Sequence, residues 1–237
     1  AEMYLINNFA KYNNLWVLDD AAQSFGGIHK HKIVGNLSEA AATSFFPAKP
    51  LGCYGDGGAV FTNDREIYEI ANSSHIHGMG KKRYEYDRIG MNARMSTIQA
   101  AILLEKLEIF PEELQKRQIV ADNYNKNLNS LNLGIELPKI KENFKSSWAQ
   151  YTILLPEYIN RDKLQEYLKS KNIPTAVYYP IPLNEHKPYN KYPVTKSGLD
   201  VTYYLSKSVL SLPMHPYLKE NDIIYISENI NNFLKKQ

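Results

Sequence analysis

Residues 41–52 read Ala-Ala-Thr-Ser-Phe-Phe-Pro-Ala-Lys-Pro-Leu-Gly and combine two signals that decide the fold. The apolar run Ala41–Phe46 predicts a buried strand. Lys49 follows it between two prolines, beside a glycine-rich turn, so its backbone is tightly constrained. An amine that forms a Schiff base must be desolvated or lie near cationic groups. A lone lysine is more often a solvated surface residue, and this stretch alone leaves both interpretations open.

Strands and helices alternate on both sides of this stretch. A helix at Met3–Tyr12 precedes a short buried strand at Leu15–Leu18. A further strand at Gly58–Thr62 is followed by a helix that Asn63 or Asp64 caps. Such alternation favours an α/β fold with a mostly parallel sheet over a sandwich.

The second half of the chain continues with helices and short strands. A helical pattern runs from Ser96 to about Leu131, and we expect Pro111 to break or kink it. Beyond it we predict helices at Arg161–Ser170, Leu199–Ser208 and Glu220–Leu234, and strands at Trp148–Leu155 and Thr175–Tyr179. The Asn- and Lys-rich segment 129–145 is the best boundary, so we expect two domains, residues 1–130 and 131–237.

Composition argues against several classes of protein. The chain is 43% apolar and 22% charged, as in ordinary globular proteins, and no apolar stretch approaches the length of a bilayer span. A single cysteine, Cys53, excludes an internal disulfide framework and fits a reducing compartment, so we expect a cytoplasmic protein. The net charge of +3 is too small to indicate nucleic-acid binding.

Two further runs surround the lysine. Residues 18–24 read Leu-Asp-Asp-Ala-Ala-Gln-Ser, with Asp19 and Asp20 at the carboxyl end of a predicted strand, where α/β sheets bind ligands. Small residues follow and let a flat ligand approach, although capping of the next turn is an equally good interpretation. Residues 52–58 read Gly-Cys-Tyr-Gly-Asp-Gly-Gly, which is not a dinucleotide fingerprint because it precedes a strand. A sharp turn beside a cofactor and an ordinary connector both remain open.

Taken together, five ordered motifs resemble the DegT/StrS family of nucleotide-sugar aminotransferases. They are Asp-Asp-Ala-Ala-Gln at 19–23, Ser-Phe-Phe-Pro-Ala-Lys at 44–49, Gly-Asp-Gly-Gly-Ala at 55–59, His-Gly at 77–78 and Gly-Met-Asn-Ala-Arg-Met at 90–95. The resemblance covers essentially the whole chain and ends in Tyr-Pro-Ile-Pro at 179–182 and Leu-Pro-Met-His at 212–215.

The resemblance implies a pyridoxal 5′-phosphate (PLP)-dependent transferase fold of type I. Residues 1–130 would be the C-terminal part of the PLP-binding large domain with its connecting helices, and residues 131–237 a small C-terminal α/β domain. Complete members carry a large portion before the residue that matches Ala1, so the resemblance implies a fragment with an open sheet edge and exposed apolar faces. We expect the 237-residue chain alone to be poorly active or inactive, and detectable turnover would contradict this.

The resemblance also assigns roles in cofactor binding. Lys49 matches the Schiff-base lysine, which shuttles a proton during the reaction. Asp20 matches the partner of the pyridinium nitrogen, and Gln23 matches the residue beside the ring and its phenolic oxygen. Ser44 matches a hydroxyl donor to the cofactor phosphate. Asn92 matches an amide that reaches the phosphate of the PLP in the other subunit, which implies a homodimer.

Five more residues are weaker candidates for substrate contacts. His77 is a candidate for lining the sugar pocket, and Arg94 is either a structural neighbour or a substrate anchor. Tyr179, His186 and His215 lie in segments that approach the active site in this family. We expect no metal site, because no cysteine lies near the pair of histidines that includes His77.

The implied reaction is ping-pong transamination of a nucleotide-linked keto-sugar, with L-glutamate as the expected amino donor. Thr43–Gly58 is most similar to enzymes that act on UDP-3-keto-N-acetylhexuronic acids in O-antigen, lipopolysaccharide or other surface polysaccharide biosynthesis. PLP sugar dehydratases of this fold carry histidine in place of the lysine, so Lys49 argues against them. The alternative is a truncated, non-catalytic remnant that acts only as an interaction or inactive protein. The intact set of cofactor-binding residues argues against long decay.

Overall fold

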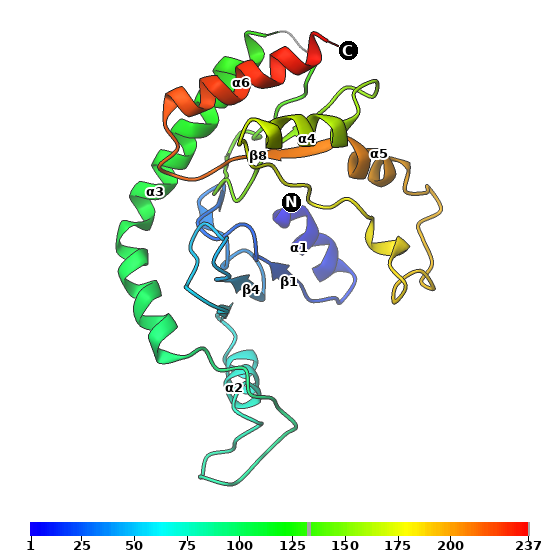
Figure 1. Ribbon diagram of the computed structural model, residues 1–237. Coiled ribbons are helices and arrows are strands. Elements are labelled where there is room, and N and C mark those ends of the chain that lie inside the picture. The colour runs from blue at the N-terminus through cyan, green and yellow to red at the C-terminus, as the bar shows by residue number, and fades with distance from the viewer. Residues whose placement is uncertain (132–133, 237) are drawn as a thin grey trace. The chain divides into compact units, whose positions relative to one another are not determined.

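The computed structural model describes residues 1–131 and 134–236. Figure 1 shows the order of the elements along the chain. The chain forms two compact units, one made of residues 1–115 and 140–149 and the other of residues 116–139 and 150–237. The expected domain division at residue 130 stays a prediction, and residues 132–133 of the expected boundary segment lie outside the described residues.

The first unit is built on a three-stranded sheet with the order β1-β4-β5. β1 (Leu18–Asp20) pairs in parallel with β4 (Ala40–Ser44), as expected. β5 (Gly58–Thr62) lies antiparallel on the other side of β4. The mostly parallel arrangement expected for the whole sheet is therefore not seen among these three strands. The glycine-rich connection from β4 to β5 contains no crossover helix, and an antiparallel pair does not need one.

Two helices of this unit form where the sequence predicts them. α1 (Met3–Tyr12) precedes β1, and α2 (Arg65–Ser74) follows β5. Asp64 caps α2, because its side chain accepts hydrogen bonds from the backbone N–H groups of Glu66 at 2.8 Å and Ile67 at 3.0 Å. The predicted cap is thus confirmed.

The strand predicted at Leu15–Leu18 is shifted to later residues, since only Leu18 of this range belongs to β1. The backbone N–H of Leu15 still donates to the carbonyl of Ala10 at the end of α1, at 2.8 Å, and the helix exit therefore delays the strand. As a result Leu15 and Trp16 are exposed.

The predicted strand Ala41–Phe46 also ends early, at Ser44. The N–H of Phe45 donates to the carbonyl of Gly57, and the N–H of Phe46 donates to the hydroxyl of Ser44 at 3.2 Å. The first bond continues the β4–β5 pairing by one residue, and the second turns the backbone away from the extended conformation at Phe46.

Aromatic side chains form the core on one face of this sheet. The ring of Phe25 lies 5.6 Å from the rings of both Phe45 and Phe110 and 6.1 Å from that of Phe61. Phe110 belongs to α3 (Thr97–Asn129), so α3 packs against these aromatic rings through this side chain. The buried core cluster consists of Phe45, Leu51, Cys53, Leu103 and Phe110.

α3 continues through Pro111, so of the two expected alternatives the break does not occur and the kink stays a prediction. A proline inside a helix removes one backbone donor and costs about 3 kcal/mol. Buried side chains on both sides of it, Phe110 in the first unit and Val120 in the second, offset this cost by packing.

A second, small antiparallel sheet in the first unit has the order β3-β2-β6. β2 (Ile28–His29) pairs with β3 (Lys32–Ile33) and with β6 (Phe144–Lys145). His29 is buried, and its ring stacks on Phe144 at 4.0 Å. This sheet anchors residues 140–149 to the N-terminal part of the chain.

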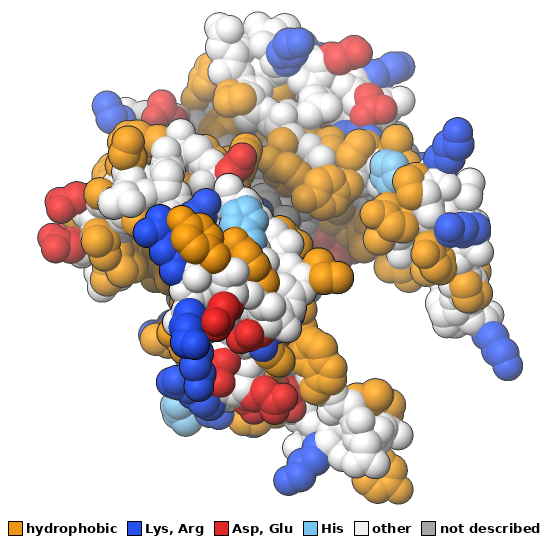
Figure 2. Space-filling model, turned by 90° about the horizontal axis from the view of Figure 1, so that it is seen from below, with side chains coloured by type: hydrophobic (Ala, Val, Ile, Leu, Met, Phe, Trp, Pro, Cys, Tyr) orange, Lys and Arg blue, Asp and Glu red, His pale blue; other side chains and the backbone are white. Residues whose placement is uncertain are grey.

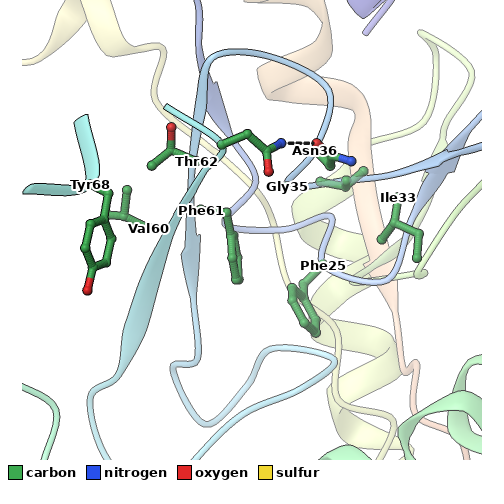
Figure 3. Close-up of a pocket in the computed structure, with 10 residues that line it drawn as sticks. Phe25, Ile33, Gly35, Asn36, Val60, Phe61, Thr62 and Tyr68 are labelled. Carbon is green, nitrogen blue, oxygen red and sulfur yellow. Dashed lines mark hydrogen bonds between the residues drawn. The ribbon is translucent and has the colours of Figure 1, made fainter. Parts of the chain in front are cut away.

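Both edges of the larger sheet lack a neighbour among the described strands, because β1 and β5 each pair only with β4. Leu18 on β1 is 54% exposed and Val60 on β5 is 55% exposed. Figure 2 shows hydrophobic side chains at the surface among charged groups. Beside β5 an apolar cavity of about 460 Å³ is lined by Phe25, Phe61 and Tyr68, among others (Figure 3). These features match the open edge and exposed apolar faces expected from the sequence.

The second unit contains an antiparallel pair of strands, β7 (Tyr151–Leu154) and β8 (Val209–Leu212). Its helices form close to the predicted positions. They are α4 (Arg161–Ser170), α5 (Asp200–Ser208) and α6 (Glu220–Leu234), with a short 3₁₀ turn, η1 (Leu183–Glu185), before α5. The buried core includes Leu164, Leu168, Ile223 and Ile230.

The two strands predicted in the second half of the chain are shorter than expected. Only the middle of Trp148–Leu155 is extended, as β7, because Trp148 has a left-handed backbone with φ of 49°. The segment Thr175–Tyr179 forms a single bridge, between Ala176 and Ser211, so the prediction of a regular strand there is wrong. Pro174 and Pro180 flank this segment, and proline supplies no N–H to a ladder.

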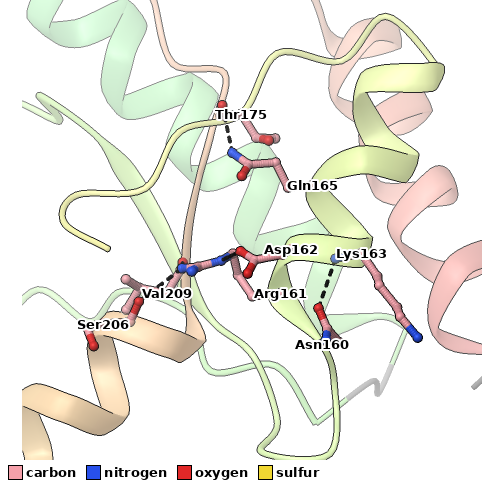
Figure 4. A network of polar contacts seen from close by, with 8 residues as sticks. All are labelled: Asn160, Arg161, Asp162, Lys163, Gln165, Thr175, Ser206 and Val209. Carbon is pink, nitrogen blue, oxygen red and sulfur yellow. Dashed lines mark hydrogen bonds and ion pairs between the residues drawn. The ribbon is translucent and has the colours of Figure 1, made fainter. Parts of the chain in front are cut away.

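A buried arginine joins three elements of the second unit (Figure 4). Arg161, at the start of α4, donates from its guanidinium to the carbonyls of Ser206 at 3.1 Å and Val209 at 3.3 Å. It also pairs with Asp162 at 2.5 Å. The cation thus satisfies carbonyl groups at the end of α5, which a helix leaves without partners of its own.

None of the helices in the described part of the chain combines the length and apolar character that a bilayer span requires.

Two stacked tyrosines lie in the core of the second unit. The rings of Tyr124 and Tyr151 are 4.7 Å apart and fully buried. Tyr124 donates to the carbonyl of Pro213 at 2.9 Å, and Tyr151 donates to Asn125 at 2.6 Å. Burial raises the pKa of both phenols.

Replacing one buried phenol tests this packing. We expect Tyr124→Phe to lower the free energy of unfolding by about 1 kcal/mol, because the carbonyl of Pro213 loses its donor while the ring stack remains. Tyr158→Phe is the matched control, since Tyr158 is exposed. Urea unfolding of both variants measures the difference, and equal midpoints would contradict the assigned bond.

Candidate functional site

Two of the predicted cofactor-binding residues, Asp20 and Ser44, lie at the carboxyl edge of the larger sheet. Asp20 pairs with Ala42 in the parallel β1–β4 ladder, and Ser44 ends β4 two residues later. The hydroxyl of Thr43 donates to the carbonyl of Ala21 at 3.1 Å and ties the loop after β1 to β4. Ligands of α/β sheets bind at this edge, beyond the carboxyl ends of parallel strands.

The two neighbouring aspartates have different environments. Asp20 is exposed, and its Oδ1 accepts a hydrogen bond from the N–H of Ala22 at 3.1 Å. Asp19 is partly buried, and its Oδ2 has no hydrogen-bond partner among the described residues. Burial raises the pKa of the Asp19 carboxyl. Asp20 therefore caps the turn with one oxygen, and its exposed carboxylate can also meet a ligand, while Asp19 lines the same cavity.

A cavity of about 320 Å³ opens beside Asp20. Gln23 and Ser24 line it from the loop after β1, and Ser146 and Ser147 line it from the segment after β6. Ser147 donates to the backbone carbonyl of Gln23 at 3.4 Å. The structure thus places Asp20 and Gln23 in the wall of one cavity.

Lys49 lies half-buried in a tightly folded loop after β4. Its backbone N–H donates to the carbonyl of Phe46 at 2.9 Å, and the N–H of Cys53 donates to the carbonyl of Phe45 at 2.8 Å. A Cβ on Gly52 would lie 2.6 Å from the carbonyl oxygen of Phe46, closer than such contacts allow. The glycine-rich run is therefore a sharp turn that fixes the backbone on either side of the lysine.

Ser44 is the last residue of β4, directly before the Lys49 loop. Its hydroxyl is half-buried and accepts a hydrogen bond from the N–H of Phe46. A hydroxyl that accepts one bond can still donate its own hydrogen, for example to an anionic oxygen.

A second group of predicted residues gathers in the segment after α2. Asn92 forms a bridge with Ile76, and the N–H of His77 donates to the carbonyl of Met91 at 2.9 Å. Arg94 donates from Nε to the side-chain oxygen of Asn92 at 2.9 Å. His77, Asn92 and Arg94 are all exposed, and no hydrogen bond or ion pair within the described residues joins them to Asp20 or Lys49.

The remaining candidates, Tyr179, His186 and His215, belong to the second compact unit. All three are exposed. His215 accepts a hydrogen bond at Nδ1 from the N–H of Tyr217 at 3.3 Å, and Tyr179 makes an edge-on contact with the ring of Tyr178. They stay predictions as substrate contacts. The described residues contain no cluster of three or more His, Cys, Asp or Glu that could hold a metal ion.

Two side chains of α3 contact the loop that carries Lys49, and these contacts are not among those predicted from the sequence. Gln99 accepts a hydrogen bond from the N–H of Tyr54 at 2.8 Å, and Lys106 donates to the carbonyl of Gly52. Their spacing of seven residues puts them on one helix face, which the sequence does show. The partners of that face lie about 50 residues away in the sequence. No local sequence pattern predicts which residues they are.

The model of the DegT/DnrJ/EryC1/StrS aminotransferase family matches residues 1–231. The chain belongs to this family. The resemblance inferred from the five motifs is thereby confirmed at the level of the family.

Individual relatives agree with this assignment. The chain is 46% identical over 232 residues to a UDP-2-acetamido-2-deoxy-3-oxo-D-glucuronate aminotransferase of Pseudomonas aeruginosa, covering 98% of this chain and 62% of the relative. It is 38% identical over 237 residues to a pleiotropic regulatory protein of Geobacillus stearothermophilus, covering 99% and 62%. A solved DegT DnrJ EryC1 StrS aminotransferase from Brucella abortus has a TM-score of 0.93 and 42% identity, covering 98% of this chain and 61% of that one.

The likeness to the solved family member confirms the fold class, the α/β fold of PLP-dependent transferases of type I. The chain spans less than two thirds of the length of each of these relatives.

The environment of Asp19 gives a pH-dependent prediction. Its folded pKa is raised by burial, so its ionisation opposes folding once the pH exceeds the unfolded value of about 3.9. We expect Asp19→Asn to raise the free energy of unfolding near neutral pH, and this gain to shrink as the pH falls through the raised folded pKa and to vanish near the unfolded value of about 3.9. Asp20→Asn is the control, because an asparagine oxygen can still accept the bond from Ala22. A gain in Asp19→Asn that does not depend on pH would contradict the assignment.

The crowding at Gly52 gives a second prediction. Gly52→Ala must displace the backbone of Phe46 and Pro47, so we expect a loss of about 1–3 kcal/mol in the free energy of unfolding. The control is Gly55→Ala, whose methyl group would meet the flexible side chain of Gln99 at 3.3 Å. Thermal unfolding compares the two variants, and a Gly52→Ala midpoint equal to that of Gly55→Ala would show that the loop is not tight.

Proposed function

We propose that this chain carries the PLP-binding core of an aminotransferase that acts on a nucleotide-linked keto-sugar. The observation that carries the proposal is that two parallel strands end at one edge of the larger sheet, where β1 leads into Asp20 and Gln23 and β4 leads into Ser44 and the Lys49 loop. Membership of the aminotransferase family and the named relative from Pseudomonas aeruginosa support it.

The residues at this edge fit PLP in their chemistry. Asp20 engages one oxygen in the turn, and its exposed carboxylate also suits a protonated ring nitrogen. The hydroxyl of Ser44 suits a phosphate oxygen. The small residues Ala21 and Ala22 leave space for a flat ring. When bound, PLP supplies an electron sink that allows a proton to leave the substrate carbon.

Each residue then has a distinct task. Asp20 holds the proton on the ring nitrogen through its negative charge. Lys49 holds the cofactor through its Nζ atom and afterwards moves a proton at the substrate carbon. Gln23 would hold the ring at its phenolic oxygen, and Ser44 would hold the phosphate. Asn92 reaches the phosphate bound by a second copy of the chain, which makes the functional unit a homodimer.

The substrate we favour is a UDP-linked 3-keto-N-acetylhexuronic acid, with L-glutamate as amino donor, in lipopolysaccharide, O-antigen or other surface polysaccharide synthesis. The name of the Pseudomonas aeruginosa relative supports this class. Arg94 is the cation that we expect to meet an anionic group of the substrate. His77, Tyr179, His186 and His215 are further proposed contacts. The single, buried cysteine fits a reducing cytoplasm as the place of reaction.

A second candidate function is a non-catalytic one, as a remnant or regulatory protein that binds partners. The 38% identity to a pleiotropic regulatory protein, across 99% of this chain, favours it. The residues suited to PLP argue for the first candidate, because an interaction protein has no need of a lysine on a constrained loop and an exposed carboxylate at the carboxyl ends of two paired strands.

Covalent capture of the cofactor distinguishes the two. After incubation with PLP and reduction by borohydride, we expect one phosphopyridoxyl group per chain on the peptide that contains Lys49. Lys49→Ala removes this adduct, and Lys32→Ala, which changes an exposed lysine of β3, leaves it intact. Mass spectrometry of digested protein locates the adduct. No adduct on Lys49, or equal labelling of Lys49→Ala, would contradict the proposal and favour the non-catalytic role.

A further inference from the structure

The loop that carries Lys49, residues 45–55, is held together partly by its own backbone. The thiol of Cys53 donates to the carbonyls of Phe45 at 2.9 Å and Gly55 at 3.1 Å. Leu51 and Cys53 are buried in the core cluster. The two ends of the loop are therefore fixed, and Lys49 lies between them in the sequence.

Two side chains of α3 also contact this loop. Lys106, which is partly buried, donates from Nζ to the carbonyl of Gly52, three residues after Lys49. The same ammonium lies 5.6 Å from the centre of the Tyr54 ring, within the range of a cation–π contact. Gln99, two turns earlier on the helix, holds the N–H of Tyr54.

The contact of Lys106 differs from that of a surface lysine. A hydrogen bond from a charged donor is about twice as strong as a neutral one. It also ends on the carbonyl of a residue with a crowded backbone, since Gly52 has no room for a Cβ against Phe46 and Pro47. A shift of Gly52 would therefore move the turn that carries the reactive lysine.

We propose that Lys106 is a positioning residue for Lys49, because its ammonium clamps the carbonyl of Gly52 and so fixes the loop that presents the lysine. The chemical consequence rests on the function proposed above, whereas the clamp itself does not. Lys106 touches neither substrate nor cofactor in this account, and it acts through the backbone of residues 49–52.

Hydrogen exchange tests the clamp without any cofactor. We expect Lys106→Met, which keeps the aliphatic stem and removes the donor, to speed amide exchange in residues 45–55 about tenfold. Lys106→Arg restores a charged donor and should exchange like the wild type. Lys126→Met removes an exposed lysine from the same helix and is the matched control. Unchanged exchange in Lys106→Met, or fast exchange in a folded Lys106→Arg, would overturn the proposal.

The rate of covalent PLP capture at Lys49 provides the second readout. We expect Lys106→Met to slow capture about tenfold and Lys106→Arg to recover the wild-type rate. A purely structural role for Lys106 would lower the thermal midpoint without this rescue of rate, and that result would count against positioning. If the wild-type chain captures no PLP, the proposed function fails, and the exchange measurement still decides whether the clamp exists.

Discussion

When β1 and β4 pair in parallel, with Leu18 opposite Ala40 and Asp20 opposite Ala42, both strands deliver their carboxyl ends to one edge of the sheet. Every candidate cofactor residue of the first unit except Asn92 depends on this pairing. Side chains alternate along a strand, so a slip of one residue would exchange the roles of Asp19 and Asp20 and bury the wrong carboxylate. The buried Ala40 and Ala41 help to hold the register, because a slip would break their packing.

The lysine loop adds a second layer of constraint to this edge. Crowded backbone at Gly52, the buried Cys53 and the contacts from Gln99 and Lys106 restrict the loop from several directions. A lysine side chain samples many rotamers, and restricting it to one costs about 2 kcal/mol of conformational entropy. A rigid backbone limits where its amine can reach, and holding a reacting group in place is itself a catalytic contribution.

Much of this arrangement could be predicted from local sequence signals. The cap at Asp64 and the helices from Arg161 to Ser170 and from Glu220 to Leu234 follow from patterns within a few turns of chain. The failures arise where distant packing decides. Pro111 stays inside a helix because buried neighbours on both sides hold it, and the contacts of Lys106 with the lysine loop cross some 50 residues of sequence. The ordered motifs are sufficient to indicate the family, because they contain the residues of the candidate site and do not depend on how distant segments pack.

We propose that Asp20 and Lys49 bind the same ligand at the carboxyl edge of β1 and β4. The most direct measurement is the nitrogen-15 chemical shift of ring-labelled PLP bound to the chain and to Asp20→Asn. We expect a protonated ring nitrogen in the wild type and in Asp19→Asn, and loss of that proton in Asp20→Asn while Lys49 still captures the cofactor. A ring nitrogen whose protonation does not depend on Asp20 would contradict it.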